Sequence, residues 1–209
     1  MSKVTTKLAE STQQVRVESP LYHADLPALA EKNLQGEVVL REKALLGHLV
    51  LRGNAGNDLF ASVVAKVLGV ALPTEPSSSA ENDQVLVQWL APDEWLIIVE
   101  GGREGQLEAQ LREQLTGHYA INDVSGGQTV LELSGPKAEL VLKKSTPYDI
   151  HPSNFPTGKC VGTVFAKSSV LLRRTGADSF ELVVRRSFAD YVWMWLQDAS
   201  QEYGLVIKR

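Results

Sequence analysis

The side chains that could do chemistry are few and widely spaced along the chain. Four histidines occur, at positions 23, 48, 118 and 151, and none has a second ligand at the spacing typical of zinc or non-haem iron sites. The single cysteine, Cys160, excludes an internal disulfide and a multi-cysteine cluster, and it suits a reducing compartment. We therefore expect surface or hydrogen-bonded histidines and no metal-binding residue.

Cys160 follows Gly158 and Lys159 in a segment that predicts a loop. A neighbouring lysine can lower the pKa of a thiol, but the sequence offers no base partner of the kind that a catalytic cysteine requires. We interpret Cys160 as a structural cysteine.

A glycine-containing turn, residues 53–56, lies between a predicted strand and a predicted helix, where backbone N–H groups can hold an anion. The turn lacks the third glycine of a dinucleotide fingerprint and the lysine of a P-loop, which favours a plain turn. Asp93, Glu94 and Asp123 lie near strand ends without a visible acid/base pairing. The sequence predicts no catalytic residue, no cofactor-binding residue and no autonomous active site.

A unit of strand, tight turn and helix organises the chain. Residues 129–133 are typical of a strand, and Ser134-Gly135-Pro136 stops it. Proline suits the first position of a helix, so Gly135 is the expected N-cap. Residues 49–54 form a second apolar strand that ends in a turn at Gly53, 82 positions before Gly135 (135 − 53).

A second repeat follows each helix, because an acidic turn precedes an aromatic-led apolar strand at Asp93 and again at Asp178. These aspartates lie 85 positions apart (178 − 93). The two similar offsets predict a duplicated α+β plan. We expect two βαβ or ferredoxin-like halves, about residues 36–120 and 121–209, with antiparallel sheets covered by helices.

Three other segments have a predictable local structure. Residues 36–40 and 44–51 are expected to pair as a β-hairpin. Residues 72–83 are rich in loop formers and predict a surface loop. Residues 1–16 are polar with isolated apolar positions, which predicts a flexible N-terminal arm.

The composition excludes some classes of protein. The chain has 209 residues, a formal net charge of −4 and a sequence pI near 5.6, whereas nucleic-acid binding needs a basic footprint. No segment approaches the ~18 apolar residues of a membrane span, and the N-terminus lacks the apolar region of a signal peptide. We expect a cytoplasmic protein that binds neither nucleic acid nor a membrane.

The last predicted helix, about residues 187–201, is apolar beyond a single stripe. The stripe consists of Phe188, Tyr191, Val192, Trp195, Leu196 and Ala199. Trp193 lies at its flank and Met194 nearly opposite. A helix with a spare apolar face is either buried on two sides or bound to another chain. Trp193 is thus either edge packing or a partner contact, and Trp193 and Met194 are the candidate interface residues.

Several stretches resemble known proteins. The passage from Asp123-Val124-Ser125 to Ser134-Gly135-Pro136, followed by Asp149-Ile150, resembles the folate-binding domain of the aminomethyltransferase superfamily. Within it, the chain resembles the gamma-subunit family of heterotetrameric sarcosine oxidases. That resemblance covers about residues 15–207 and is carried by Val17-Glu18-Ser19-Pro20-Leu21, by residues 89–96 (WLAPDEWL) and by residues 186–192 (RSFADYV) with Trp195-Leu196. It implies that residues 17–209 form a single aminomethyltransferase-like domain.

The resemblance also implies a function. In that family a four-subunit enzyme oxidatively demethylates sarcosine to glycine and passes the one-carbon unit to tetrahydrofolate. FAD, covalently bound FMN, NAD and zinc are expected in the alpha, beta and delta subunits. This chain is then a small accessory subunit that binds no cofactor itself. It is much shorter than the aminomethyltransferases, and their folate-contacting acidic residue has no assigned position here.

Two alternatives stay open. One is a stand-alone folate-binding protein, similar to superfamily members linked to iron–sulfur assembly. Those carry a longer motif around a cysteine, of which residues 158–163 keep the cysteine and a glycine two residues later. The other is a scaffold module unrelated to one-carbon metabolism. Neighbouring genes for large flavin-binding subunits favour the accessory-subunit interpretation over both.

Overall fold

The computed structural model describes residues 17–32 and 35–209, and the predicted arm, residues 1–16, lies outside the described residues. The helices are η1 Tyr22–Ala24, α1 Leu26–Ala30, α2 Asp58–Leu68, α3 Glu104–Gln114, η2 Ser125–Gly127, α4 Ala138–Ser145, η3 Arg186–Phe188 and α5 Ala189–Ser200. The strands are β1 Val38–Lys43, β2 Gly47–Arg52, β3 Ser79–Glu81, β4 Val85–Ala91, β5 Glu94–Val99, β6 Ala120–Asp123, β7 Gln128–Ser134, β8 Cys160–Phe165, β9 Ser168–Gly176, β10 Ser179–Arg185 and β11 Leu205–Lys208.

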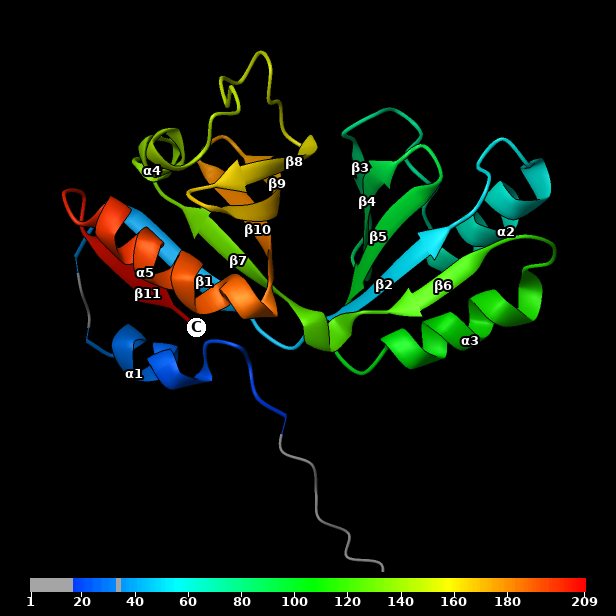
Figure 1. Ribbon diagram of the computed structural model, residues 1–209, viewed down its shortest axis with the longest axis horizontal. Coiled ribbons are helices and arrows are strands. Elements are labelled where there is room, and N and C mark those ends of the chain that lie inside the picture. The colour runs from blue at the N-terminus through cyan, green and yellow to red at the C-terminus, as the bar shows by residue number, and fades with distance from the viewer. Residues whose placement is uncertain (1–16, 33–34) are drawn as a thin grey trace, which may run out of the picture.

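The strands form two sheets, which Figure 1 shows as two lobes with their helices on the outer sides. One sheet has the order β3-β4-β5-β2-β6 and the other β11-β1-β7-β10-β9-β8. Strands β1 and β11 run parallel, while the other neighbouring strands run antiparallel. The α+β class with antiparallel sheets covered by helices is confirmed.

The two sheets follow one plan. We call residues 47–123 half 1 and residues 128–208 half 2. In half 1, β2-α2-β4-β5-α3-β6 is a ferredoxin-like βαββαβ unit with β3 added at the edge. In half 2, β7-α4-β9-β10-α5-β11 repeats it with β8 at the edge. The predicted duplication is therefore present, except that β1 is inserted between β7 and β11 in the sheet of half 2.

The strand pairing moves the boundaries of the halves. Strand β6 completes the sheet of half 1, so that half ends at Asp123 instead of about residue 120. Strand β1 precedes half 1 in the sequence but lies between β7 and β11 in the other sheet. The predicted hairpin of residues 36–40 with 44–51 is therefore wrong, because β1 and β2 belong to different sheets.

Hydrogen bonds at the turns confirm the equivalence of the halves. The Gly53 N–H donates to the Asp93 carbonyl at 3.0 Å, and the Gly135 N–H donates to the Asp178 carbonyl at 3.0 Å. Gly135 has φ +110°, and a Cβ there would lie 2.5 Å from the Glu37 carbonyl oxygen. Only glycine fits this position without strain.

The start of α4 differs from the prediction. The helix begins at Ala138 with Lys137 at the N-cap, while Gly135 and Pro136 form the turn that precedes it. Gly135 and Pro136 are part of a tight turn, in which the Ala138 N–H donates to the Gly135 carbonyl at 3.0 Å, and the helix begins after this turn. In half 1, α2 has regular caps: the Asn57 side chain accepts from two backbone N–H groups, and Gly69 ends the helix at φ +69°.

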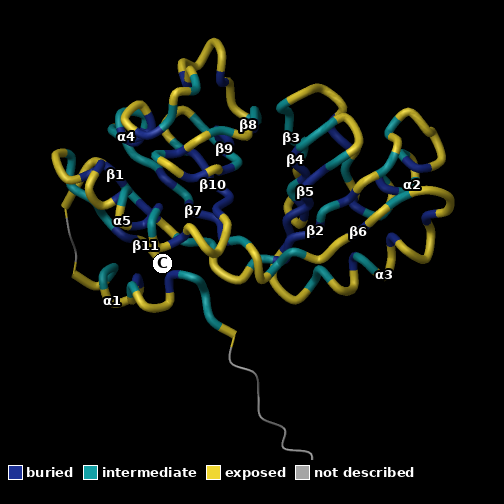
Figure 2. Tube along the Cα trace, in the orientation of Figure 1, coloured by how far each residue is buried: buried dark blue, intermediate teal, exposed yellow. Residues whose placement is uncertain are grey.

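The apolar core has three parts. One cluster packs α4 and α5 on the sheet of half 2, and a second packs α2 and α3 on the sheet of half 1. The third lies between the sheets, where Leu96 and Ile98 of β5 meet Val130 of β7 and Val183 of β10. Figure 2 shows the buried residues concentrated in the strands. Across the described ranges, none of the helices has the length and apolar content that crossing a membrane takes.

Candidate functional site

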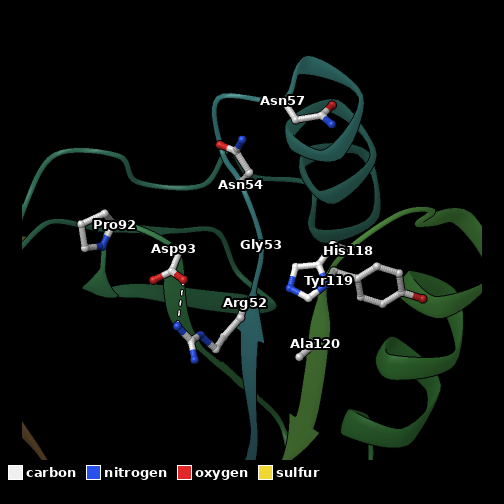
Figure 3. A pocket seen from close by; sticks show the side chains of 9 residues that line it. All are labelled: Arg52, Gly53, Asn54, Asn57, Pro92, Asp93, His118, Tyr119 and Ala120. Atoms are coloured by element: carbon white, nitrogen blue, oxygen red, sulfur yellow. Dashed lines mark hydrogen bonds and ion pairs between the residues drawn. The ribbon is translucent and has the colours of Figure 1, made fainter.

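A cavity of about 730 Å³ opens at the end of β2 and is lined in part by the glycine-containing turn, residues 53–56 (Figure 3). Its lining includes Arg52, Asn54, Asp93, His118 and Tyr119. Arg52 Nη2 donates to Asp93 Oδ2 at 2.8 Å. Because both side chains are about half exposed (52% and 55%), this ion pair contributes little to stability.

Several backbone N–H groups of this turn and of the first turn of α2 are already occupied. The Gly56 N–H donates to Asn54 Oδ1 at 2.9 Å, and the N–H groups of Leu59 and Phe60 donate to Asn57 Oδ1 at 3.0 and 3.3 Å. The first turn of α2 also carries the acidic Asp58, which opposes an anion at the helix N-terminus. The geometry favours the plain turn over a phosphate or dinucleotide site.

A cluster of five charged side chains lies between the sheets. Glu181 Oε2 accepts from Arg173 Nη2 at 2.8 Å, and Glu181 Oε1 accepts from Lys43 Nζ at 2.5 Å. Lys43 also lies 3.1 Å from Glu132 Oε2. Arg173 Nη1 reaches across to Glu81 of half 1 at 2.8 Å. The Arg173 and Glu181 side chains are only 6% and 5% exposed, and a cavity of about 250 Å³ adjoins them.

Glu181 and Lys43 keep their charges at neutral pH. Burial by itself raises the pKa of Glu181, but Arg173 and Lys43 outweigh it and hold the pKa below its usual value. Burial by itself lowers the pKa of Lys43, and the contacts with Glu181 and Glu132 outweigh it, so that pKa is raised. Neither group is poised to exchange a proton near pH 7. The cluster is therefore a structural link that ties half 1 to half 2 through Glu81.

The sequence analysis missed this cluster, although a signal was present. Glu132 interrupts an apolar strand, and Glu181 does the same in β10. A charged residue on the buried face of a strand needs a partner. Those partners are Lys43 of β1 and Arg173 of β9, and Arg173 also pairs with Glu81 of β3. The sequence alone does not bring these strands together.

Cys160 lies at a junction between the halves. Its N–H donates to the Ser77 carbonyl at 2.8 Å, its Sγ contacts the Ser78 carbonyl at 3.1 Å, and Ser79 Oγ donates to the Gly158 carbonyl at 2.6 Å. Burial raises the pKa of the thiol to about 11, so it is not an activated nucleophile.

Two predictions are corrected at this junction. Cys160 begins strand β8 instead of lying in a loop. Residues 72–83 are more than a surface loop, because they contain β3 and the half 1 side of the junction.

The four histidines lie in separate places. His48 is fully buried, its Nδ1 bonds the Leu46 carbonyl at 3.0 Å, and burial lowers its pKa. His23 Nε2 lies 2.6 Å from Asp190 Oδ1, His151 Nδ1 lies 2.7 Å from Ser153 Oγ, and His118 lines the cavity at β2. Within residues 17–32 and 35–209, no three histidine, cysteine or carboxylate side chains converge as metal ligands do.

The two candidate interface residues on α5 differ in burial. Trp193 is 6% exposed and packs in the core of half 2. Its assignment to a partner interface is therefore corrected to packing within the chain, the other interpretation that the sequence allowed. Met194 is 53% exposed, and Phe188 at the start of the helix is 42% exposed. Met194 stays a predicted interface residue.

The chain is similar to known gamma subunits over nearly its full length. The family model described as "Sarcosine oxidase, gamma subunit family" matches residues 52–202. The sarcosine oxidase subunit gamma of an Arthrobacter species is 40% identical over 202 residues, covering 94% of this chain and 95% of that protein. That of Corynebacterium sp. strain P-1 is 39% identical over 201 residues, with the same coverage.

Solved structures agree with these similarities. A chain of the heterotetrameric sarcosine oxidase from Corynebacterium sp. U-96, solved in complex with pyrrole 2-carboxylate, matches with a TM-score of 0.80 at 35% identity. The match covers 89% of this chain and 95% of that chain. The glycine cleavage system aminomethyltransferase T of Bartonella henselae matches with a TM-score of 0.64 at 14% identity, over 90% of this chain and 58% of that one. This second match confirms the predicted aminomethyltransferase-like fold, and together these similarities show that the chain belongs to the sarcosine oxidase gamma subunit family.

Proposed function

We propose that this chain is the gamma subunit of a heterotetrameric sarcosine oxidase and assembles with alpha, beta and delta subunits. One observation carries the proposal: the match to gamma subunits extends over 94% of this chain and 95% of the relatives. The match to a chain from a solved heterotetrameric enzyme supports it. The complex then oxidatively demethylates sarcosine to glycine, passes the one-carbon unit to tetrahydrofolate and lies in the cytoplasm.

The chain's own residues support an accessory role without catalysis. The buried carboxylate Glu181 is held in ion pairs with Arg173 and Lys43, and the pKa of the Cys160 thiol lies near 11. The turn at the end of β2 does not fit a dinucleotide phosphate, because Asn54 and Asn57 occupy its N–H groups. We therefore assign FAD, FMN, NAD and zinc to the other subunits.

Co-purification tests the proposal. The tagged chain is expressed in its native host, and the eluate is examined for partner subunits, flavin absorbance and sarcosine-dependent oxygen uptake. We expect large flavoprotein partners and activity in the complex. The chain purified alone is expected to show neither flavin absorbance nor oxygen uptake. Oxygen uptake by the single chain, or a wild-type chain that elutes without flavoprotein partners, contradicts the proposal, and a tetrahydrofolate titration then tests the stand-alone folate-binding alternative.

A further inference from the structure

A groove of about 380 Å³ lies on half 2 between the C-terminal end of α4, the turn from β8 to β9, and α5. Its lining includes Ser145, Thr146, Pro147, Lys167, Tyr191 and Trp195. Tyr191 and Trp195 are only partly buried, so their rings form an apolar floor that solvent reaches. A concave surface with aromatic side chains and a few polar groups is typical of a binding site.

The indole N–H of Trp195 and the Ser145 hydroxyl beside it already have hydrogen-bond partners. Trp195 Nε1 donates to Ser145 Oγ at 2.9 Å, and Ser145 Oγ donates to the Val141 carbonyl at 2.6 Å. The Ala166 N–H donates to the Ser145 carbonyl at 2.6 Å. These bonds hold the indole in place, so an occupant needs to supply no partner for it and meets a preformed apolar surface.

The two lysines of the groove differ. Lys144 donates to the Ala199 carbonyl at 2.9 Å, pairs with Glu202 and lies over the Tyr203 ring. Lys167 is exposed, and it makes no ion pair or hydrogen bond with any described residue. Lys167 is thus a cation at the edge of the groove that is free to bind an anionic group.

Half 1 contains the equivalent groove with different chemistry. It lies beside α2 and α3, has a volume of about 240 Å³, and is lined by Gln106 and Gln110. These glutamines stand 85 positions before Tyr191 and Trp195 (191 − 106 and 195 − 110), the same offset as the aspartate pair. Because half 1 folds with glutamine at both positions, the fold does not require the aromatic pair of half 2.

We infer that the α4–α5 groove is the docking site of a partner subunit within the proposed complex, an inference that rests on the proposed function. The occupant is an extended segment that lays an apolar side chain on Tyr191 and Trp195 and places a carboxylate at Lys167. Exposed Met194 lies on the same helix but does not line the groove. Tyrosine and tryptophan are enriched in interfaces, and the unpaired lysine calls for an acidic group.

The test uses the complete complex. All four subunits are co-expressed with gamma carrying Lys167→Glu, Lys167→Arg or the double substitution Tyr191→Gln/Trp195→Gln, which installs the residues of half 1. Lys66→Glu is the matched control, since Lys66 is exposed on α2 of half 1. The dissociation constant of gamma from the other three subunits is measured at two salt concentrations, and each variant's melting temperature is measured alone.

We expect Lys167→Glu to weaken assembly about tenfold at low salt and less at high salt, because a charge at the interface rim is screened. Loss of the aromatic pair is expected to weaken assembly about thirtyfold, as for interface hot spots. Lys167→Arg and Lys66→Glu are expected to bind like wild type.

Two outcomes overturn the inference: Lys167→Glu binding like wild type, and Lys66→Glu weakening assembly equally. Lys167→Glu decides the matter even if the double variant is less stable, because Lys167 makes no contact that the folded chain needs. Wild-type gamma that binds no flavoprotein subunit refutes the proposed function instead, so the two failures are distinguishable.

Discussion

The two halves share a topology but differ on the faces that meet between the sheets. In half 1, Gln88 pairs across the strands with Leu96. At the equivalent positions of half 2, 85 residues later, Arg173 pairs with Glu181. Gln88 is fully buried, and neither its amide nitrogen nor its amide oxygen has a partner among the described residues. Half 2 carries charges there and pairs them.

The difference shows which positions the fold constrains. The strand faces beneath the helices are apolar in both halves, and both glycine turns keep the same hydrogen bond to an aspartate carbonyl. The residues on the sheet faces that meet between the halves can differ, as long as each buried charge is paired. In half 2 the partners of Glu181 are Arg173 of β9 and Lys43 of β1, and half 1 has no strand equivalent to β1.

The largest effect is expected when equivalent positions of the outer helices α5 and α3 are substituted. Trp193 of α5 is buried, whereas its equivalent 85 positions earlier, Glu108 of α3, pairs with Arg112 on the surface of its helix. Trp193→Ala is expected to lower the free energy of unfolding of the isolated chain by about 3–5 kcal/mol. The control Glu108→Ala is expected to change it by less than about 0.5 kcal/mol. Urea unfolding measures both, and equal losses would contradict the core assignment of Trp193.

The second prediction removes one charge of the cluster. Glu181→Leu leaves Arg173 buried with only Glu81, and we expect a loss of about 3 kcal/mol in the free energy of unfolding, as for a broken buried ion pair. The double variant Arg173→Gln/Glu181→Leu installs the residue pair of half 1 and is expected to recover most of that loss. If the double variant is less stable than Glu181→Leu, the halves are not interchangeable at these positions.

The third prediction concerns pH. Burial lowers the pKa of His48 below its usual 6.5, so the unfolded chain binds a proton that the folded chain does not as the pH falls below that value. Stability is therefore lost with falling pH through the folded-state pKa, by at most ~1.4 kcal/mol per pH unit. The variant His48→Leu places an apolar residue where half 2 has Val130, the equivalent position 82 residues later. It is expected to flatten the dependence of the free energy of unfolding on pH between pH 7 and pH 5.5. Chemical unfolding of both proteins across this pH range measures the effect. If the free energy of unfolding of the variant falls with pH as steeply as that of the wild type, His48 is not the cause.

The smallest effect is expected at the junction between the halves. Cys160 pairs with Arg173 across β8 and β9, and Ser79 pairs with Gln88 at the equivalent position of half 1. Cys160→Ser therefore gives both halves the same residue at this position. We expect a change of less than about 1 kcal/mol in the free energy of unfolding, because a hydroxyl also bonds the Ser78 carbonyl. In the wild type, the high pKa and burial of the thiol predict slow labelling by a thiol reagent at pH 8 in native protein and fast labelling in urea. Fast native labelling would show that the junction opens.

Local signals in the sequence predicted what depends on near neighbours. The turn from β4 to β5 is set by a few adjacent residues, and the spacing of the glycine and aspartate repeats was enough to indicate the duplication. The fold class followed from these repeats. The partners of β1 could not be predicted, because its choice of β7 and β11 over the adjacent β2 depends on pairing across the whole chain.

The candidate sites were less predictable for the same reason. Trp193 sits at the flank of its helix stripe, and only the packing of half 2 decides whether that flank is covered. The charged cluster needs side chains from β1, β3, β7, β9 and β10. The aromatic pair of the groove, Tyr191 and Trp195, has the spacing of ordinary core residues. The groove exists there because the end of α4 and the turn from β8 to β9 lie beside this pair.

The position of β1 has a consequence for synthesis on the ribosome. All five strands of the half 1 sheet lie within residues 47–123, so this half has its pairing partners early. Strand β1 is translated before all of them, yet its parallel neighbour β11 begins 162 positions after Lys43 (205 − 43). Until the C-terminus is translated, β1 keeps an open edge, the kind that recruits other strands. We expect a chain cut short before Leu205 to retain a folded half 1 and to be removed by proteases or lost to aggregation through β1, so the last strand distinguishes complete chains from incomplete ones.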